Sequence, residues 1–218
     1  MKISISESRT VMLAAVLVLA VVTNAGTHIG RTLLTANILP SIPDAQLTPP
    51  TSESLYGLDI QIQTSAGTQI SLASAADRPR IATLFYTSCP VTCPLTIATM
   101  QSIDSQLTPQ QRNRLGMLMV SFDPANDSPQ ALAQLENSHG IDTDRWLVGR
   151  TSPHQLKQLA AALDQHVVPL ADGSFDHRGS LVLLDATGRI LARTEKMGAP
   201  DPAFLQAVRS AVETKATL

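Results

Sequence analysis

The chain has 218 residues, of which 44% are hydrophobic, and its formal net charge is −2. This length and composition suit one globular domain with a sizeable core. The near-neutral charge leaves no broad basic face, which argues against a nucleic-acid-binding protein.

The N-terminus has the pattern of an export segment. Lys2 and Arg9 precede an uncharged apolar run over residues 11–22. That length is typical of a signal-peptide core and falls short of the ~20 apolar residues of a membrane span. We therefore predict that residues 1–26 are a signal peptide or a membrane anchor, and that the proline-containing residues 27–54 are a tether. This organisation predicts an exported protein on the periplasmic side of the inner membrane, either anchored or released.

Residues 55–214 show the alternation of strands and helices that is typical of an α/β domain. The predicted elements, in chain order, are a hairpin over residues 58–74, a buried strand over 80–86, a helix over 94–107, a buried strand over 115–122, a helix over 128–140, a short strand over 145–149, a helix over 152–163, a hairpin over 180–194 and a helix over 200–213. This order predicts a thioredoxin-like three-layer sandwich with an N-terminal β-hairpin extension, followed by a tail over residues 215–218.

The two cysteines of the chain, Cys89 and Cys93, lie in the segment TLFYTSCPVTCPLT, and a proline follows each of them. The segment joins a predicted buried strand to a predicted helix, with Cys93 at the helix cap. Unpaired amides and the positive end of the helix dipole stabilise thiolates there. The pair could form a structural disulfide, act as a redox couple or share a soft metal ion. A disulfide that closes so short a loop would stabilise the fold little.

One histidine is placed to join the cysteines. The chain has five: His28, His139, His154, His166 and His177. We expect the first four to lie in the tether, at a helix end or in solvent. His177 precedes a buried strand, and in a thioredoxin-like sheet the loop before that strand faces the cysteine loop. Two thiolates and an imidazole suit Cu(I) or Cu(II), and Asp176 is a candidate to orient the histidine ring.

The chain resembles the Sco/SenC family in four ordered blocks: FYTSCPVTCPLT, VSFDPANDSPQALAQL, RWLVGRTSPHQLKQLAAAL and DGSFDHRGSLVLLDATGRILART. The resemblance spans residues 55–212. It implies a thioredoxin-like, usually membrane-tethered protein that binds copper and helps to metallate the CuA site of cytochrome c oxidase. It also implies that Cys89, Cys93 and His177 hold one copper ion per chain, and that Asp123 lies near the site as a structural residue or a partner of the ligands.

Two positions depart from the family pattern. The family often has an acidic residue between the cysteines, where this chain has Val91 and Thr92. After the histidine the family commonly has serine, where this chain has Arg178. The first change removes a negative charge from the loop, and an inward-pointing cation at the second would disfavour a metal ion.

Three functions follow from this pattern. The main hypothesis is a copper metallochaperone, not an enzyme, that delivers the ion to the oxidase subunit carrying CuA or to another apo-cuproprotein, with another copper carrier as a further partner. The alternative is a thiol–disulfide reductase in which Cys89 and Cys93 act on target cysteines without obligatory metal. A weaker hypothesis is a thiol peroxidase with Arg178 beside the attacking cysteine. His177 separates the first two, because only a copper carrier needs it as a ligand.

Overall fold

The computed structural model describes residues 54–171 and 175–213. The predictions for residues 1–26, for the tether up to residue 53 and for residues 215–218 lie outside the described residues. Within the described part, no helix has the length and apolar character needed to cross a membrane.

A seven-stranded sheet, in the order β2-β1-β5-β4-β3-β8-β9, forms the middle layer. The strands β3 (Arg80–Phe85), β4 (Gly116–Ser121) and β5 (Trp146–Arg150) pair in parallel. The strands β8 (Leu181–Leu184) and β9 (Ile190–Thr194) continue the sheet in antiparallel pairing. Every residue of β3, β4 and β8 is buried, because both faces of the sheet are covered.

The predicted N-terminal hairpin extends this sheet. Its strands β1 (Gln61–Thr64) and β2 (Gln69–Ser71) pair with each other, and β1 also pairs with β5 at the sheet edge. Short helical segments that the sequence analysis did not predict lie at η1 (Leu55–Gly57), η2 (Leu72–Ala75) and α2 (Pro109–Arg112).

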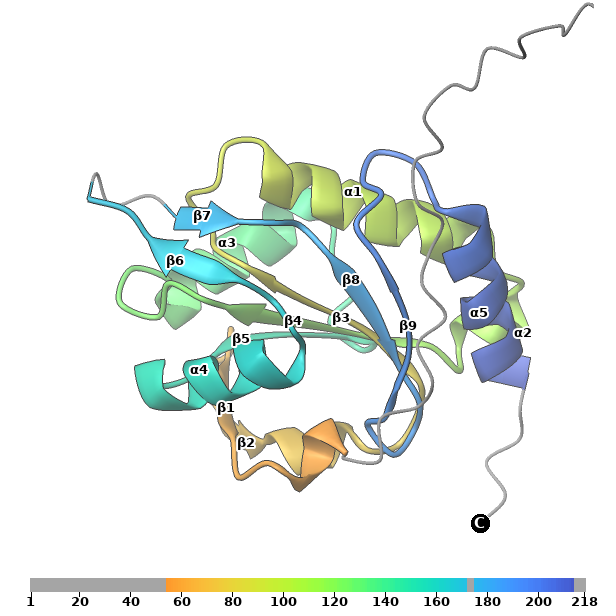
Figure 1. Ribbon diagram of the computed structural model, residues 1–218, viewed down its shortest axis with the longest axis horizontal. Helices are drawn as coiled ribbons and strands as arrows, with labels where there is room; N and C mark the ends of the chain where they lie inside the picture. The colour runs from red at the N-terminus through yellow and green to blue at the C-terminus, as the bar shows by residue number, and fades with distance from the viewer. Residues whose placement is uncertain (1–53, 172–174, 214–218) are drawn as a thin grey trace, which may run out of the picture. The chain divides into compact units, whose positions relative to one another are not determined.

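Helices cover both faces of the sheet. The helix α1 (Thr92–Ser105) lies on one side and α4 (Pro153–Ala162) on the other (Figure 1). The remaining long helices are α3 (Pro129–His139) and α5 (Pro202–Glu213). The Gln101 side-chain amide of α1 donates to the His139 carbonyl at the end of α3, and the Arg209 guanidinium of α5 donates to the carbonyl of Gln106, the residue that caps α1. These layers and the parallel β-α-β-α-β order are those of the predicted thioredoxin-like sandwich.

Local signals set the ends of two helices as predicted. The hydroxyls of Ser128 and Ser152 accept hydrogen bonds from backbone amides three residues on, and a proline holds the first helical position in each case. Gly140 ends α3 with φ 59°, a left-handed conformation that glycine adopts without strain.

Two placements near the cysteines differ from the prediction. The helix α1 begins at Thr92 rather than Pro94, because a proline in the first turn removes only an amide that has no intrahelical acceptor. Cys93 is therefore the second residue of α1, and Val91 holds the cap position. His177 is not in a loop: it ends the strand β7 (Phe175–His177), which pairs with β6 (Val167–Pro169) in a separate two-stranded ribbon.

The contact between β1 and β5 leaves no room for a side chain at Gly149. A Cβ there would lie 2.3 Å from Ile62 Cγ2 and 2.8 Å from the backbone oxygen of Gln63. Because backbone cannot rotate away, we expect Gly149→Ala to lower the free energy of unfolding in urea by about 1–3 kcal/mol. Gly57→Ala is the control, since a Cβ there meets nothing within 4 Å. Equal losses in the two variants would contradict this account.

Candidate metal site

Three side chains from separate segments form a compact donor set. The ligand atoms of Cys89, Cys93 and His177 all lie within 4.8 Å of one another. Cys89 belongs to the loop between β3 and α1, Cys93 to the first turn of α1, and His177 to β7, which runs beside that loop (Figure 1). Both cysteines are buried free thiols, and His177 is half-buried. Within residues 54–171 and 175–213, no other group of three histidine, cysteine or carboxylate side chains is gathered in this way.

The sulfur of Cys89 takes the place of a capping oxygen at the start of α1. Val91 contributes no side-chain cap bond, and the backbone amide of Cys93 donates to Cys89 Sγ at 3.4 Å. Burial by itself would raise the pKa of the Cys89 thiol. Hydrogen bonds from the amides of Cys93, Val91 and Thr92 and from the Cys93 thiol outweigh burial and lower that pKa.

Cys93 behaves in the opposite way. Burial raises the pKa of its thiol far above the ordinary value; a hydrogen bond from the Tyr86 backbone opposes the rise, and the charges of Cys89 and Asp127 add to it. The prediction that the helix N-terminus would stabilise both thiolates is therefore wrong for Cys93, where loss of water outweighs the amides. A bound cation would supply the positive charge that a Cys93 thiolate lacks.

The ring of His177 presents an unused nitrogen. Its Nδ1 lies 3.2 Å from the carbonyl oxygen of Phe175. A carbonyl only accepts hydrogen bonds, so Nδ1 carries the proton and Nε2 keeps a free lone pair. That Nε2 is buried and has no hydrogen-bond partner among the described residues. An unsatisfied buried nitrogen is costly, and coordination of a metal ion would remove the cost.

Of the two predicted neighbours of the ligands, Asp176 does not orient His177, and Asp123 has the structural role that was one of its two predicted alternatives. Asp176 is a candidate from the sequence to orient the His177 ring, with an exposed carboxylate as the alternative; it is exposed, and the Phe175 carbonyl holds Nδ1. Side chains alternate between the faces of a strand, which turns Asp176 away from the face of His177. The buried Asp123 carboxylate accepts two contacts, of 2.8 and 3.0 Å, from the Asn126 amide nitrogen and so closes the loop after β4.

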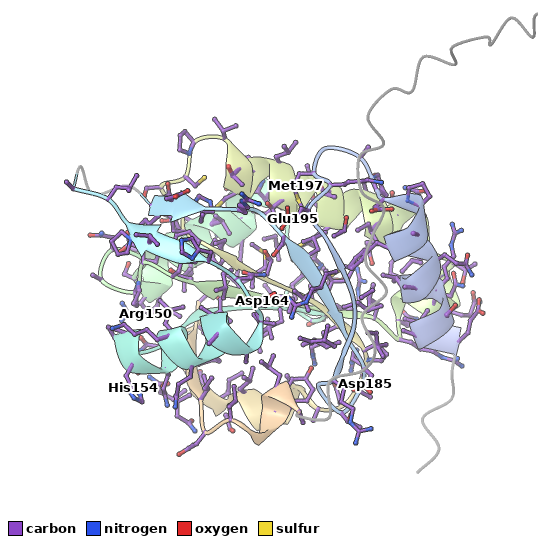
Figure 2. All side chains as sticks on the ribbon, viewed as in Figure 1. Arg150, His154, Asp164, Asp185, Glu195 and Met197 are labelled. Atoms are coloured by element: carbon purple, nitrogen blue, oxygen red, sulfur yellow. The ribbon has the colours of Figure 1, made fainter. Side chains whose placement is uncertain are left out.

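Arg178 points into solvent. Its side chain is 82% exposed, and its guanidinium lies 4.0 Å from the carboxylate of Glu195, which follows β9 (Figure 2). The cation next to His177 in the sequence therefore does not face the donor set. A thiol peroxidase would need this arginine beside the attacking cysteine, so the geometry disfavours that hypothesis.

The other described histidines lie on other elements. His139 ends α3, His154 is exposed in the first turn of α4 (Figure 2), and His166 is exposed just before β6. These positions match the helix-end and solvent positions that the sequence predicted.

Sequence reasoning missed a shell of aromatic rings around His177. The ring centroids of Tyr86 and Phe122 lie 5.5 and 5.0 Å from the imidazole, and both rings also contact Phe175. Burial first, and then the charge and hydrogen bond of Cys89, raise the pKa of Tyr86. A signal was available, because Tyr86 and Phe122 end predicted strands and Phe175 shares a strand face with His177.

Comparison with known proteins places this donor set in a family. A sequence model described as SCO1/SenC matches residues 49–213. A protein of Stutzerimonas stutzeri that is named for copper binding is 31% identical over 110 residues. That match covers 48% of this chain and 52% of the relative, so it spans about half the relative's length.

Solved structures share the fold. BsSco, described as a member of the Sco family of cytochrome c oxidase assembly proteins, is 22% identical with a TM-score of 0.63, covering 78% of this chain and 99% of that chain. Arabidopsis thaliana ScoI with copper bound is 13% identical with a TM-score of 0.60, covering 77% and 99%. Both likenesses confirm the predicted thioredoxin-like architecture.

The unequal thiols predict an order of modification. At neutral pH we expect iodoacetamide to label Cys89 of the metal-free protein faster than Cys93, because the thiolate is the nucleophile and a lowered pKa leaves more of it. The Cys89 rate should level off below the ordinary thiol pKa, whereas the Cys93 rate should still rise above it. Peptide mass spectrometry over a pH series measures both rates. The Cys89→Ser and Cys93→Ser variants report each thiol by itself, and faster labelling of Cys93 would contradict the assignment.

Proposed function

The chain belongs to the SCO1/SenC family, and on that premise we propose that it is a copper metallochaperone that assists metallation of the CuA site of cytochrome c oxidase or of a related cuproprotein. The observation that carries the proposal is the buried, unpartnered Nε2 of His177 beside the sulfurs of Cys89 and Cys93.

The donor set fits copper by its chemistry. Thiolates are soft ligands that suit Cu(I), and an imidazole helps to retain Cu(II). Structural zinc sites instead close with four protein ligands, and three donors are gathered here within the described residues. A three-donor site also leaves a coordination position through which a ligand of the recipient can enter, as delivery of a cargo ion requires.

The surface beside Cys89 suits such an exchange. Val91 is 68% exposed and Leu95 is 40% exposed, and Pro90 and Pro94 next to them are exposed too. All four residues are uncharged. A recipient that brings its own ligands to the copper ion would therefore pack against an apolar edge rather than an acidic one.

The proposed setting follows from the N-terminal sequence. Residues 1–26 have the charge and apolar pattern of a signal peptide or an anchor, which supports a protein on the periplasmic side of the inner membrane. The proposed recipient is the oxidase subunit that carries CuA, and another copper carrier is the proposed donor.

The unequal thiols also support a thiol–disulfide reductase as a second candidate. The Cys89 thiolate would attack a target disulfide and form a mixed disulfide. Cys93 would then lose its proton, attack Cys89 Sγ and release the target as two thiols. Two electrons would pass to the target, and the chain would keep a Cys89–Cys93 disulfide.

Copper binding tests the proposal directly. We expect the reduced full chain to bind one Cu(I), and His177→Ala to weaken the affinity by at least about tenfold, because substituting even the partner of a ligand costs ~10–100-fold. Competition with a chromogenic Cu(I) chelator measures the affinity. His166→Ala is the control, since His166 is exposed and outside the donor set. Weak binding that His177→Ala leaves unchanged would overturn the copper site.

The second candidate makes a different prediction for the same variant. A reductase that uses only the thiols should reduce a disulfide in a purified CuA domain at the wild-type rate after His177→Ala. A chaperone should lose transfer of copper to the same domain when it is supplied reduced. Thiol counting and the absorption of the CuA centre follow the two reactions. Wild-type copper transfer by His177→Ala would contradict delivery from the three-donor site.

A further inference from the structure

We propose that Asp127 is a positioning residue whose buried negative charge biases the bound copper ion toward Cu(II). The inference rests on the proposed copper site and concerns a side chain that is not one of its donors. Asp127 lies in the loop between β4 and α3 and is 0% exposed.

The Asp127 carboxylate joins its own loop to the start of the cysteine loop and to the end of β4. It accepts hydrogen bonds from the backbone amide of Thr87 at 3.2 Å to Oδ1 and 3.1 Å to Oδ2, and Oδ1 also accepts from the Thr87 hydroxyl. The hydroxyl of Ser121, at the end of β4, donates to Oδ2 at 2.5 Å. Thr87 stands two residues before Cys89, so this network fixes the start of the cysteine loop to the end of β4.

The partners of the Asp127 carboxylate are all uncharged. The Ser121 hydroxyl oxygen already accepts the Asp123 amide at 3.0 Å, which directs its own proton to Asp127. The donors, from Thr87 and Ser121, are all neutral, so they orient the charge without cancelling it.

The Asp127 carboxylate is held next to the cysteine loop, because it accepts the backbone amide of Thr87, which stands two residues before Cys89. When copper binds, the two thiolates and Asp127 contribute three negative charges in a region from which water is excluded. Cu(I) offsets one of these charges and Cu(II) offsets two. Coulomb interactions in such a region are several times stronger than in water. Asp127 therefore stabilises Cu(II) more than Cu(I), and opposes the one-electron reduction Cu(II) + e⁻ → Cu(I).

The ratio of Cu(II) affinity to Cu(I) affinity tests this inference. We expect Asp127→Asn, which removes the charge and keeps the shape, to lower the ratio about tenfold or more, equivalent to a rise of at least ~59 mV in the one-electron reduction potential. A redox titration of the copper-loaded full chain with mediators measures the potential. Thermal unfolding of the metal-free protein shows whether the variant is folded. If Asp127→Asn is unfolded, Asp127→Ser removes the same charge with a smaller hydrogen-bonding side chain.

Thr87→Val is the matched control, because it removes one hydrogen bond to Asp127 and keeps the charge. We expect the ratio of Cu(II) affinity to Cu(I) affinity in this variant to stay within about threefold of the wild-type ratio, since the Coulomb interaction is retained. An unchanged ratio in the charge-removing variants would overturn the inference. An equal fall of the affinity ratio in Thr87→Val would also overturn the inference, because the effect would then come from the position of the cysteine loop and not from the charge. In either case, if the wild-type chain binds one copper ion, the proposed function still stands. If the wild-type chain binds neither Cu(I) nor Cu(II), the inference and the proposed function are both overturned.

Discussion

Burial of two thiols at the start of one helix is the constraint on which the rest of the site depends. The first turn of α1 leaves backbone amides without intrahelical acceptors, and Cys89 Sγ accepts the amide of Cys93 at 3.4 Å. Cys93 lies within the same turn, where loss of water dominates. Two identical side chains four residues apart thereby acquire opposite acidities. A bound cation therefore stabilises the Cys93 thiolate most, because burial otherwise disfavours that thiolate.

The remaining parts of the structure hold the third donor against this pair. The ribbon of β6 and β7 brings His177 to the end of the sheet from which the cysteine loop leaves. The rings of Tyr86, Phe122 and Phe175 limit the water around the imidazole, and the Phe175 carbonyl fixes its tautomer. Since Tyr86 and Phe122 directly follow fully buried strands, the rigid centre of the sheet sets the position of the shell.

Copper delivery and disulfide exchange would use the same sulfur atoms. A Cys89 thiol with a lowered pKa beside a Cys93 thiol with a raised pKa suits an attacking and a resolving thiol, and it equally suits a site that is completed when a metal ion arrives. The feature that favours copper is the free Nε2 of His177, which disulfide exchange does not need. The uncharged edge at Val91 and Leu95 is compatible with either kind of partner.

The sequence by itself determined the order of strands and helices, the ends of α3 and α4 and the choice of Cys89, Cys93 and His177 as candidates. Those features depend on local periodicity, on cap residues and, for the ligands, on family resemblance. Only the tertiary structure decided which thiol has the lowered pKa, which nitrogen of His177 is free and that Asp127 binds the start of the cysteine loop. Acidity and hydrogen bonding depend on burial and on neighbours such as Thr87 and Ser121, which are distant in the chain and meet only when the sheet forms.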